Sequence, residues 1–237
     1  MNNHCRNCCN NCRGKLCASK VSIFQNLNDE ELLEVVKTIN HKEYNRGDII
    51  FTEGNMANTL YFINEGNIKL YKYTKDGKEQ ILHVLSEGEF FGELDLIKPS
   101  KYGFNSKAIV NSKICTLTKD EMKDIIMRKP EIGIKVLETV GERVSKIENL
   151  VQNLATNDVD SRLAYLLIDL MERYGEIIEK NISIKLPLSR EDMANYIGVT
   201  RETISRKLKK FEDEKLIKIA GKRNIIILDE EVLKNYI

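Results

Sequence analysis

The apolar residues change their spacing along the chain, and these changes predict its elements. From Val21 they recur at helical spacing, and Asn28 with Glu31 three residues later is typical of a helix N-cap. From about residue 44 to 117, short apolar runs alternate with glycines, which predicts antiparallel strands of a sandwich or barrel, with a hairpin tip at Asp76-Gly77. From residue 119 the spacing is helical again. After residue 157 it predicts helices followed by a short β-hairpin.

The second helical stretch carries a heptad seam. A strict period of 3.5 residues makes a narrow stripe that suits a coiled coil with a second copy. An amphipathic helix packed on its own domain is the alternative. We predict a homodimer, and its interface residues are Leu137, Val140, Val144, Ile147, Val151 and Leu154.

The C-terminal part predicts a helix-turn-helix. Ser189 caps a first helix, Gly198 makes a tight turn, and Thr200 caps a second helix. The second helix has a buried stripe at Ile204, Leu208 and Phe211. A helix-turn-helix projects the opposite or N-terminal face into the major groove, and here that face holds Arg201, Glu202, Ser205 and Arg206.

These side chains suit the reading of bases. An Arg donates two hydrogen bonds to guanine, and a Glu accepts one from cytosine. Residues 201–223 include nine basic and four acidic residues, a balance that favours contact with phosphates. Lys207 follows the base-reading residues, and Lys222 and Arg223 lie at the predicted hairpin tip, where they would form a wing. We therefore predict double-stranded DNA as a partner, the alternative being a lysine-rich surface helix.

Composition narrows the class of protein. The chain has 237 residues, of which 42% are hydrophobic and 31% charged, and its formal net charge is +1. A wholly disordered chain combines low hydrophobicity with high net charge, so this chain is expected to fold. The sequence has no apolar run approaching about 18 residues and no apolar signal region, so we expect a cytoplasmic protein without a membrane span. It contains no nucleophile–base pair, P-loop or dinucleotide fingerprint, and we expect no enzyme.

The cysteines suggest a metal or redox site. Five of the six fall between Cys5 and Cys17. In a reducing compartment, such a cluster binds metal or performs redox chemistry more often than it forms disulfides. On the residues alone, an iron–sulfur cluster and zinc are equally good interpretations, and a thiol redox switch is a third.

The order of these parts resembles the CRP/FNR family of bacterial transcription regulators. Glu202, Ser205 and Arg206 match the FNR pattern E-x-x-S-R, and Arg201 matches the Arg that CRP members carry before the Glu. The resemblance implies half-sites with a TGA-type core, and contact with RNA polymerase by family analogy. It implies an α+β chain with four parts: a cysteine-rich arm (1–20), a cyclic-nucleotide-binding-like β-roll (21–128), a long dimerisation helix (129–156) and a winged helix-turn-helix (157–237).

The resemblance argues against cyclic AMP as the effector. CRP members bind its phosphate with a Gly-Glu-Leu segment and an Arg about ten residues later. Here Gly92-Glu93-Leu94 is present, but KYGFNSKA follows without an Arg. The nearest cations are Lys101 and Lys107, and a Lys does not reproduce the two-pronged contact of an Arg. We expect Gly92 and Glu93 to serve a structural turn.

The resemblance to the FNR branch favours a [4Fe–4S] cluster over zinc and over haem, which some family members use and for which this chain has His4, His41 and His83. FNR members hold the cluster on three N-terminal cysteines and one distant cysteine, whose position Cys115 matches. Their C-x2-C-x5-C pattern comes nearest at Cys9, Cys12 and Cys17, and Cys5 or Cys8 can replace one of these. The resemblance thus implies a sensor of oxygen or nitric oxide, and the arm also resembles regulators of nitrosative stress in anaerobic bacteria.

One seam residue departs from the oxygen-sensing FNR proteins. They place an Asp where this chain has Ile147, and that charge makes their dimerisation depend on the cluster. Since Ile147 removes the repulsion, we predict a dimer even without the cluster.

Overall fold

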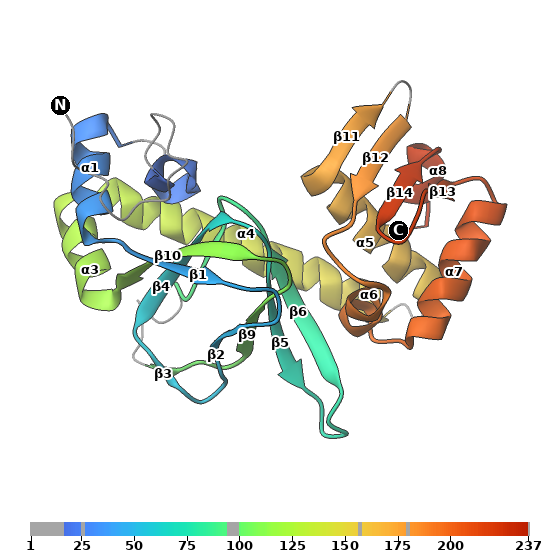
Figure 1. Cartoon of the computed structure of the whole chain (residues 1–237), viewed down its shortest axis with the longest axis horizontal. Coiled ribbons are helices and arrows are strands. Elements are labelled where there is room, and N and C mark those ends of the chain that lie inside the picture. The colour runs from blue at the N-terminus through green and yellow to red at the C-terminus, as the bar shows by residue number, and fades with distance from the viewer. Residues whose placement is uncertain (1–16, 25–26, 94–99, 156–157, 179–180, 237) are drawn as a thin grey trace. The chain divides into compact units, whose positions relative to one another are not determined.

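A computed structural model describes residues 17–24, 27–93, 100–155, 158–178 and 181–236 (Figure 1). The chain divides into two compact units, one made of residues 1–72 and 82–143 and the other of residues 73–81 and 144–237. The fold joins an N-terminal β-roll, helices and a C-terminal helix-turn-helix, as the sequence predicts.

The described part of the first unit starts with short helices. These are η1 (Cys17–Lys20), η2 (Ser22–Phe24) and α1 (Asp29–Thr38). The predicted cap of α1 is confirmed, because the side chain of Asn28 accepts from the backbone of Glu31 and that of Glu31 accepts from the backbone of Asn28. Leu32, Val35 and Val36 give α1 its buried face.

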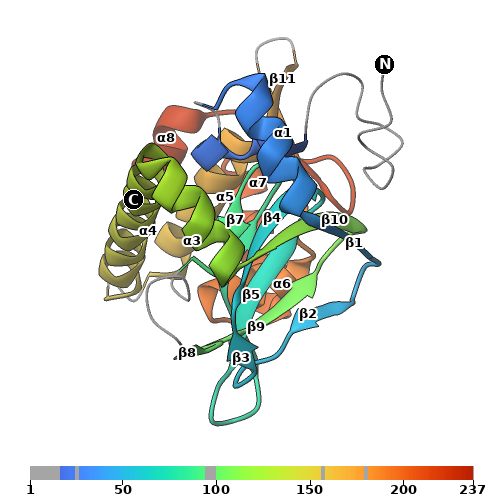
Figure 2. The same cartoon turned by 90° about the vertical axis from the view of Figure 1, so that its left-hand side faces the viewer.

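Antiparallel strands form the roll, as the alternation of apolar runs and glycines predicts. The first sheet has the order β1 (Asn40–Tyr44), β10 (Ser112–Thr118), β4 (Thr59–Glu65) and β7 (Phe90–Phe91). The second has the order β2 (Ile49–Phe51), β9 (Asn105–Ala108), β5 (Ile68–Tyr73) and β6 (Glu79–Leu85), and β3 (Met56–Ala57) pairs with β8 (Ser100–Lys101). The predicted tip between β5 and β6 is confirmed, with Gly77 at φ 74°. Figure 2 shows β1 beside β10.

The interior of the roll is filled by aromatic side chains. The rings of Phe51 and Tyr102 stack with centroids 3.7 Å apart, and those of Tyr61 and Phe91 stack at 4.8 Å. Phe104, which directly precedes β9, packs on Phe51 with ring centroids 5.8 Å apart. Tyr102 and Phe104 belong to the KYGFNSKA segment, so this segment supplies packing to the core.

Two helices follow the roll, α3 (Lys119–Arg128) and α4 (Pro130–Ala155). Pro130 suits the first turn of α4, where a backbone N–H would have no helical partner. Ile132 and Val136 are buried in a core cluster with α1, η1, η2 and Cys115. On the same helix Leu137 and Val144 are exposed, at 62% and 49%. The N-terminal half of α4 is thus part of the roll's core. Of its predicted seam residues, Leu137 and Val144 are exposed, whereas Val140 is partly buried against this core, as the alternative of a helix packed on its own domain expects.

The second unit contains α5 (Val159–Tyr174), α6 (Arg190–Ile197), α7 (Arg201–Asp213) and α8 (Glu230–Lys234). Its sheet has the order β11 (Gly175–Ile178), β12 (Asn181–Lys185), β14 (Asn224–Ile227) and β13 (Ile217–Ile219). The predicted hairpin is β13 with β14. Strands β11 and β12 extend it into a four-stranded sheet that the sequence pattern does not predict.

Candidate functional site

The turn between α6 and α7 is built by local contacts (Figure 1). Ser189 and Asp192 form a capping box at the start of α6. Gly198 ends that helix at φ 75°, a left-handed conformation that favours glycine. Thr200 then caps α7 by accepting from the backbone N–H of Thr203. The sequence prediction of a helix-turn-helix is confirmed in each of these details.

The α7 helix is held by its apolar stripe. Ile204, Leu208 and Phe211 are at most 1% exposed. Burial of this stripe leaves the other face of α7 in solvent, and the exposed residues there are Arg201, Glu202, Ser205 and Arg206. The hydroxyl of Ser205 donates to the carbonyl of Arg201 at 3.1 Å, so it is free to accept a further hydrogen bond. This face has the donors and acceptors that reading of base edges requires.

The first turn of α5 contacts the helix-turn-helix. Arg162 Nη1 donates to the carbonyl of Ile197, at 2.8 Å, immediately before the turn. Asp160 lies 2.8 Å from the Nζ atoms of both Lys207 and Lys210. Burial by itself would raise the pKa of Asp160, but hydrogen bonds and charges from the two lysines outweigh it and hold the pKa below its ordinary value. Lys207, a predicted DNA contact, is therefore ion-paired within the protein.

The β13–β14 hairpin provides the predicted wing. Lys222 is exposed at its tip beside Gly221, whose φ is 122°. Arg223 is half-buried, and its Nη1 donates to the carbonyl of Pro187 at 3.1 Å. The backbone N–H of Leu186 donates to the carbonyl of Arg223. The wing is thus fastened to the segment that enters α6, with Lys222 presented to solvent.

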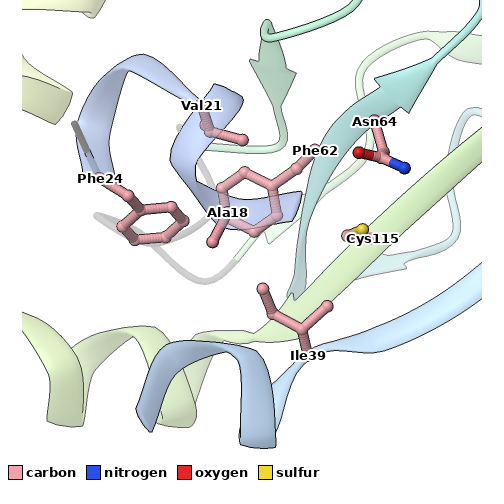
Figure 3. A pocket seen from close by; sticks show the side chains of 7 residues that line it. All are labelled: Ala18, Val21, Phe24, Ile39, Phe62, Asn64 and Cys115. Atoms are coloured by element: carbon pink, nitrogen blue, oxygen red, sulfur yellow. The ribbon is translucent and has the colours of Figure 1, made fainter. Parts of the chain in front are cut away.

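A small pocket in the first unit contains Cys115 (Figure 3). Cys115 comes from β10 and is 4% exposed. Phe62 and Asn64 of β4 and Ile39 at the end of α1 line the pocket, and η1 and η2 close it with Ala18, Val21 and Phe24. Ala18 directly follows Cys17, so the end of the cysteine-rich arm and Cys115 meet at one pocket.

Cys115 has a histidine neighbour that the sequence analysis did not assign to it. His41 lies opposite Cys115 in the β1–β10 ladder, and its Nδ1 is 3.2 Å from Cys115 Sγ. Burial lowers the pKa of His41, so the neutral imidazole is favoured. A neutral ring with a protonated Nδ1 donates to sulfur. No sequence signal links these residues, because only the strand register pairs them.

Several predicted residues lie outside the described part of the chain. These are Cys5, Cys8, Cys9 and Cys12, and for Cys17 the backbone alone is described. The side chains of Ile147, Val151 and Leu154 also lie outside it. Within the described ranges no group of three or more His, Cys, Asp or Glu side chains is arranged to hold a metal ion. The ligand set therefore stays a prediction.

The Gly92-Glu93 segment forms a structural turn, as expected. Gly92 has φ 88°, and a Cβ there would lie 2.5 Å from the carbonyl oxygen of Thr59. Glu93 is 5% exposed. Both the backbone angle and the close approach require glycine, so the local packing accounts for Gly92 without a ligand.

Across the described residues, no helix has both the length and the apolar character to span a membrane.

Comparisons with known proteins match both units. Residues 41–129 match the family model described as a cyclic nucleotide-binding domain, and residues 161–236 match the Crp-like helix-turn-helix domain. The fumarate and nitrate reduction regulatory protein of Vibrio cholerae is 26% identical, covering 98% of this chain and 89% of that protein. The CRP-like cAMP-activated global transcriptional regulator of Mycobacterium tuberculosis is also 26% identical, covering 91% and 96%. The structure of FixK2 from Bradyrhizobium japonicum shares the fold, with a TM-score of 0.75 at 22% identity over 84% of this chain and 96% of that one.

Proposed function

Because this chain is a DNA-binding transcription regulator of the CRP/FNR family, we propose that it senses oxygen or nitric oxide through a [4Fe–4S] cluster. The proposed ligands are Cys115 and three cysteines of the arm, namely Cys9, Cys12 and Cys17, with Cys5 or Cys8 able to replace one. The regulator acts as a homodimer on palindromic DNA. By family analogy it also contacts RNA polymerase.

The observation that carries the proposal is the shared pocket of Cys115 and Ala18. Cys115 offers a soft thiolate donor from the core, and the residue after Cys17 lines the same pocket. Iron–sulfur clusters are held by such thiolates, often from one short cysteine run and one distant residue. The donor chemistry and the position of the arm's end thus fit a cluster.

When bound, the cluster supplies a centre that oxygen or nitric oxide can attack. The chain's own residues connect it to the dimerisation helix. Ala18 at the end of the arm, with Val21 and Phe24 just after it, belongs to one core cluster with Ile132 and Val136 of α4. Close-packed cores transmit small shifts, because they repack between discrete arrangements. A change in how the arm is held therefore alters the support of α4.

The exposed side chains on α4 support the dimer. Leu137 and Val144 are large apolar residues, and both are exposed, whereas Val136 on the same helix is buried. Side chains packed against the chain's own core would be less exposed than these two. A second copy of the same stripe would cover them. Two recognition helices on palindromic DNA must lie one turn of the duplex apart, about 34 Å. The dimer helix sets this spacing.

At the DNA the exposed face of α7 reads base edges. The proposed base-reading residues are Arg201, Glu202, Ser205 and Arg206, while Thr200, Lys222 and Arg223 contact the phosphate backbone. Such phosphate contacts position a protein on the duplex, and base contacts specify the site.

The direct test measures iron, acid-labile sulfide and zinc per chain in the anaerobically purified full chain. We expect about four irons with as much sulfide, and an absorption band that air or nitric oxide bleaches. Separate exposure to each gas identifies the signal. Zinc without sulfide would overturn the cluster and leave the DNA-binding assignment in place.

A further inference from the structure

Asp160 connects two helices of the DNA-binding unit by its charge. It lies in the first turn of α5, and its side chain is 9% exposed. Oδ1 is 2.8 Å from Lys207 Nζ and Oδ2 is 2.8 Å from Lys210 Nζ. Each carboxylate oxygen thus pairs with one lysine of the recognition helix α7, from a residue 50 positions before Lys210.

The ammonium groups of the two lysines are paired with α5, and Lys207 is the more buried of the two. The side chain of Lys207 is 24% exposed and that of Lys210 is 43% exposed. Lys210 also lies 3.7 Å from Glu214, and its Nζ is 5.8 Å from the centre of the Tyr236 ring. Their neighbour Arg206, by contrast, is exposed on the face that also holds Arg201 and Glu202. The helix thus has exposed arginines on its base-reading face and two lysines that are ion-paired with α5.

The pairing of Lys207 and Lys210 with Asp160 affects how specifically the protein binds DNA. Every lysine that contacts a phosphate strengthens binding to all sequences alike, because phosphates carry no sequence information. A carboxylate that pairs with two lysines of the recognition helix cancels one of their two charges and holds both ammonium groups beside α5. It thereby lowers this general affinity and leaves the base-reading face intact. Specificity of this kind is gained by suppressing the wrong complex, without any new contact to the right one.

We propose that Asp160 is a specificity-determining residue that withholds Lys207 and Lys210 from DNA phosphates and so keeps sequence-independent binding weak. This revises the expectation that Lys207 contacts DNA directly. Asp160 itself touches no base. It acts through the two lysines, whose positions it determines.

The test compares Asp160→Asn with Asp213→Asn in the full chain. Asparagine is close in shape to aspartate and removes the charge. Asp213 is a matched control, because it also pairs with a lysine of α7, Lys209 at 3.2 Å, but on the exposed side of the helix, where Lys209 keeps a second partner in Glu212. Binding to a mixed-sequence DNA duplex is measured by fluorescence anisotropy over a range of salt concentrations.

We expect tighter binding by Asp160→Asn, with a log–log salt slope steeper by about 0.9, since Lys207 is released whereas Lys210 keeps Glu214 as a second partner. Asp213→Asn should change the slope by less than half as much. Adding Lys207→Gln to Asp160→Asn should return about 0.9 of the slope. An Asp160→Asn slope equal to that of the control would overturn the proposal and reduce Asp160 to a structural ion pair.

A second set of variants tests the proposal even if Asp160→Asn does not fold. In the otherwise unchanged chain, Lys207→Gln and Lys210→Gln should leave the salt slope as it is, because both ammonium groups are held in ion pairs within the protein. Lys222→Gln, which removes an exposed cation proposed to contact a phosphate, should make it shallower by about 0.9. A loss of slope in either lysine variant comparable to that of Lys222→Gln would show that the lysines contact phosphates and would refute the proposal.

Discussion

Cys115 Sγ lies 3.2 Å from Nδ1 of His41 on the adjacent strand β1. The sulfur proposed as a cluster ligand therefore already has a nitrogen neighbour placed by the sheet register. Hydrogen bonds to ligand sulfurs are among the features that set the reduction potential of an iron–sulfur centre. The contact makes His41 a positioning residue for Cys115.

Replacing His41 by Phe keeps a planar ring and removes the nitrogen. If Nδ1–H donates to Cys115, its loss lowers the reduction potential, because the donor stabilises the more negative, reduced state. A redox titration followed by absorption measures the shift. The reduction potential of His41→Gln, which retains a donor, is expected to lie between that of the unaltered chain and that of His41→Phe. A potential unchanged in His41→Phe at full iron content would contradict this role.

Cys115→Ser is predicted to lower the iron content of the anaerobic protein sharply while the chain stays folded. Serine is close in size to cysteine but supplies a poorer ligand for iron. Because Cys115 is buried, we also expect a moderate loss of stability of about 1 kcal/mol. Iron per chain and the circular dichroism spectrum separate the two effects. Each arm cysteine is also replaced singly by Ser, at Cys5, Cys8, Cys9, Cys12 and Cys17. Three of these variants should lower the iron content equally. If none of them does, the arm supplies no ligand to the cluster.

Charge placed on the exposed stripe of α4 is predicted to break the dimer. Leu137→Asp or Val144→Asp would put repelling carboxylates at the proposed seam. Analytical ultracentrifugation should report a monomer for each. Ile177→Asp is the control, since Ile177 is 82% exposed on β11 and outside the seam. The unaltered chain should remain dimeric without metal, as expected from Ile147. A monomeric metal-free protein would contradict that expectation.

The ion pairs of Asp160 predict a pH dependence of stability. The pKa of Asp160 is depressed in the folded chain, so the folded state favours the charged carboxylate more than the unfolded chain does. The resulting stabilisation is fully present above the unfolded pKa of about 3.9, and it is lost as pH falls through the folded value. Asp160→Asn should therefore melt lower than the unaltered chain at pH 6. The difference should shrink as the pH is lowered below about 4, and calorimetry at several pH values measures it. A difference that grows toward low pH would be inconsistent with this pairing.

Much of the fold follows from local signals in the sequence. The caps at Asn28, Ser189 and Thr200, the turns at Gly77 and Gly198, and the buried stripe of α7 all form as predicted. Such features depend on contacts within one helical turn or one hairpin, so neighbouring residues suffice to specify them. By contrast, β1 has the polar sequence NHKEY, and only its partner β10 makes it a strand. Likewise β11 is wholly exposed, and its pairing with β12 shows only in the fold.

The sequence by itself determined the order of roll, long helix and helix-turn-helix, and which residues of α7 are exposed opposite its buried stripe. It also singled out Cys115 by resemblance. Only the tertiary structure decided which residues Cys115 and Lys207 meet. His41 is 74 positions from Cys115, and Asp160 lies on a different helix from Lys207. Periodicity and capping describe neighbours along the chain, whereas these contacts arise from strand register and helix packing, which depend on the whole buried core.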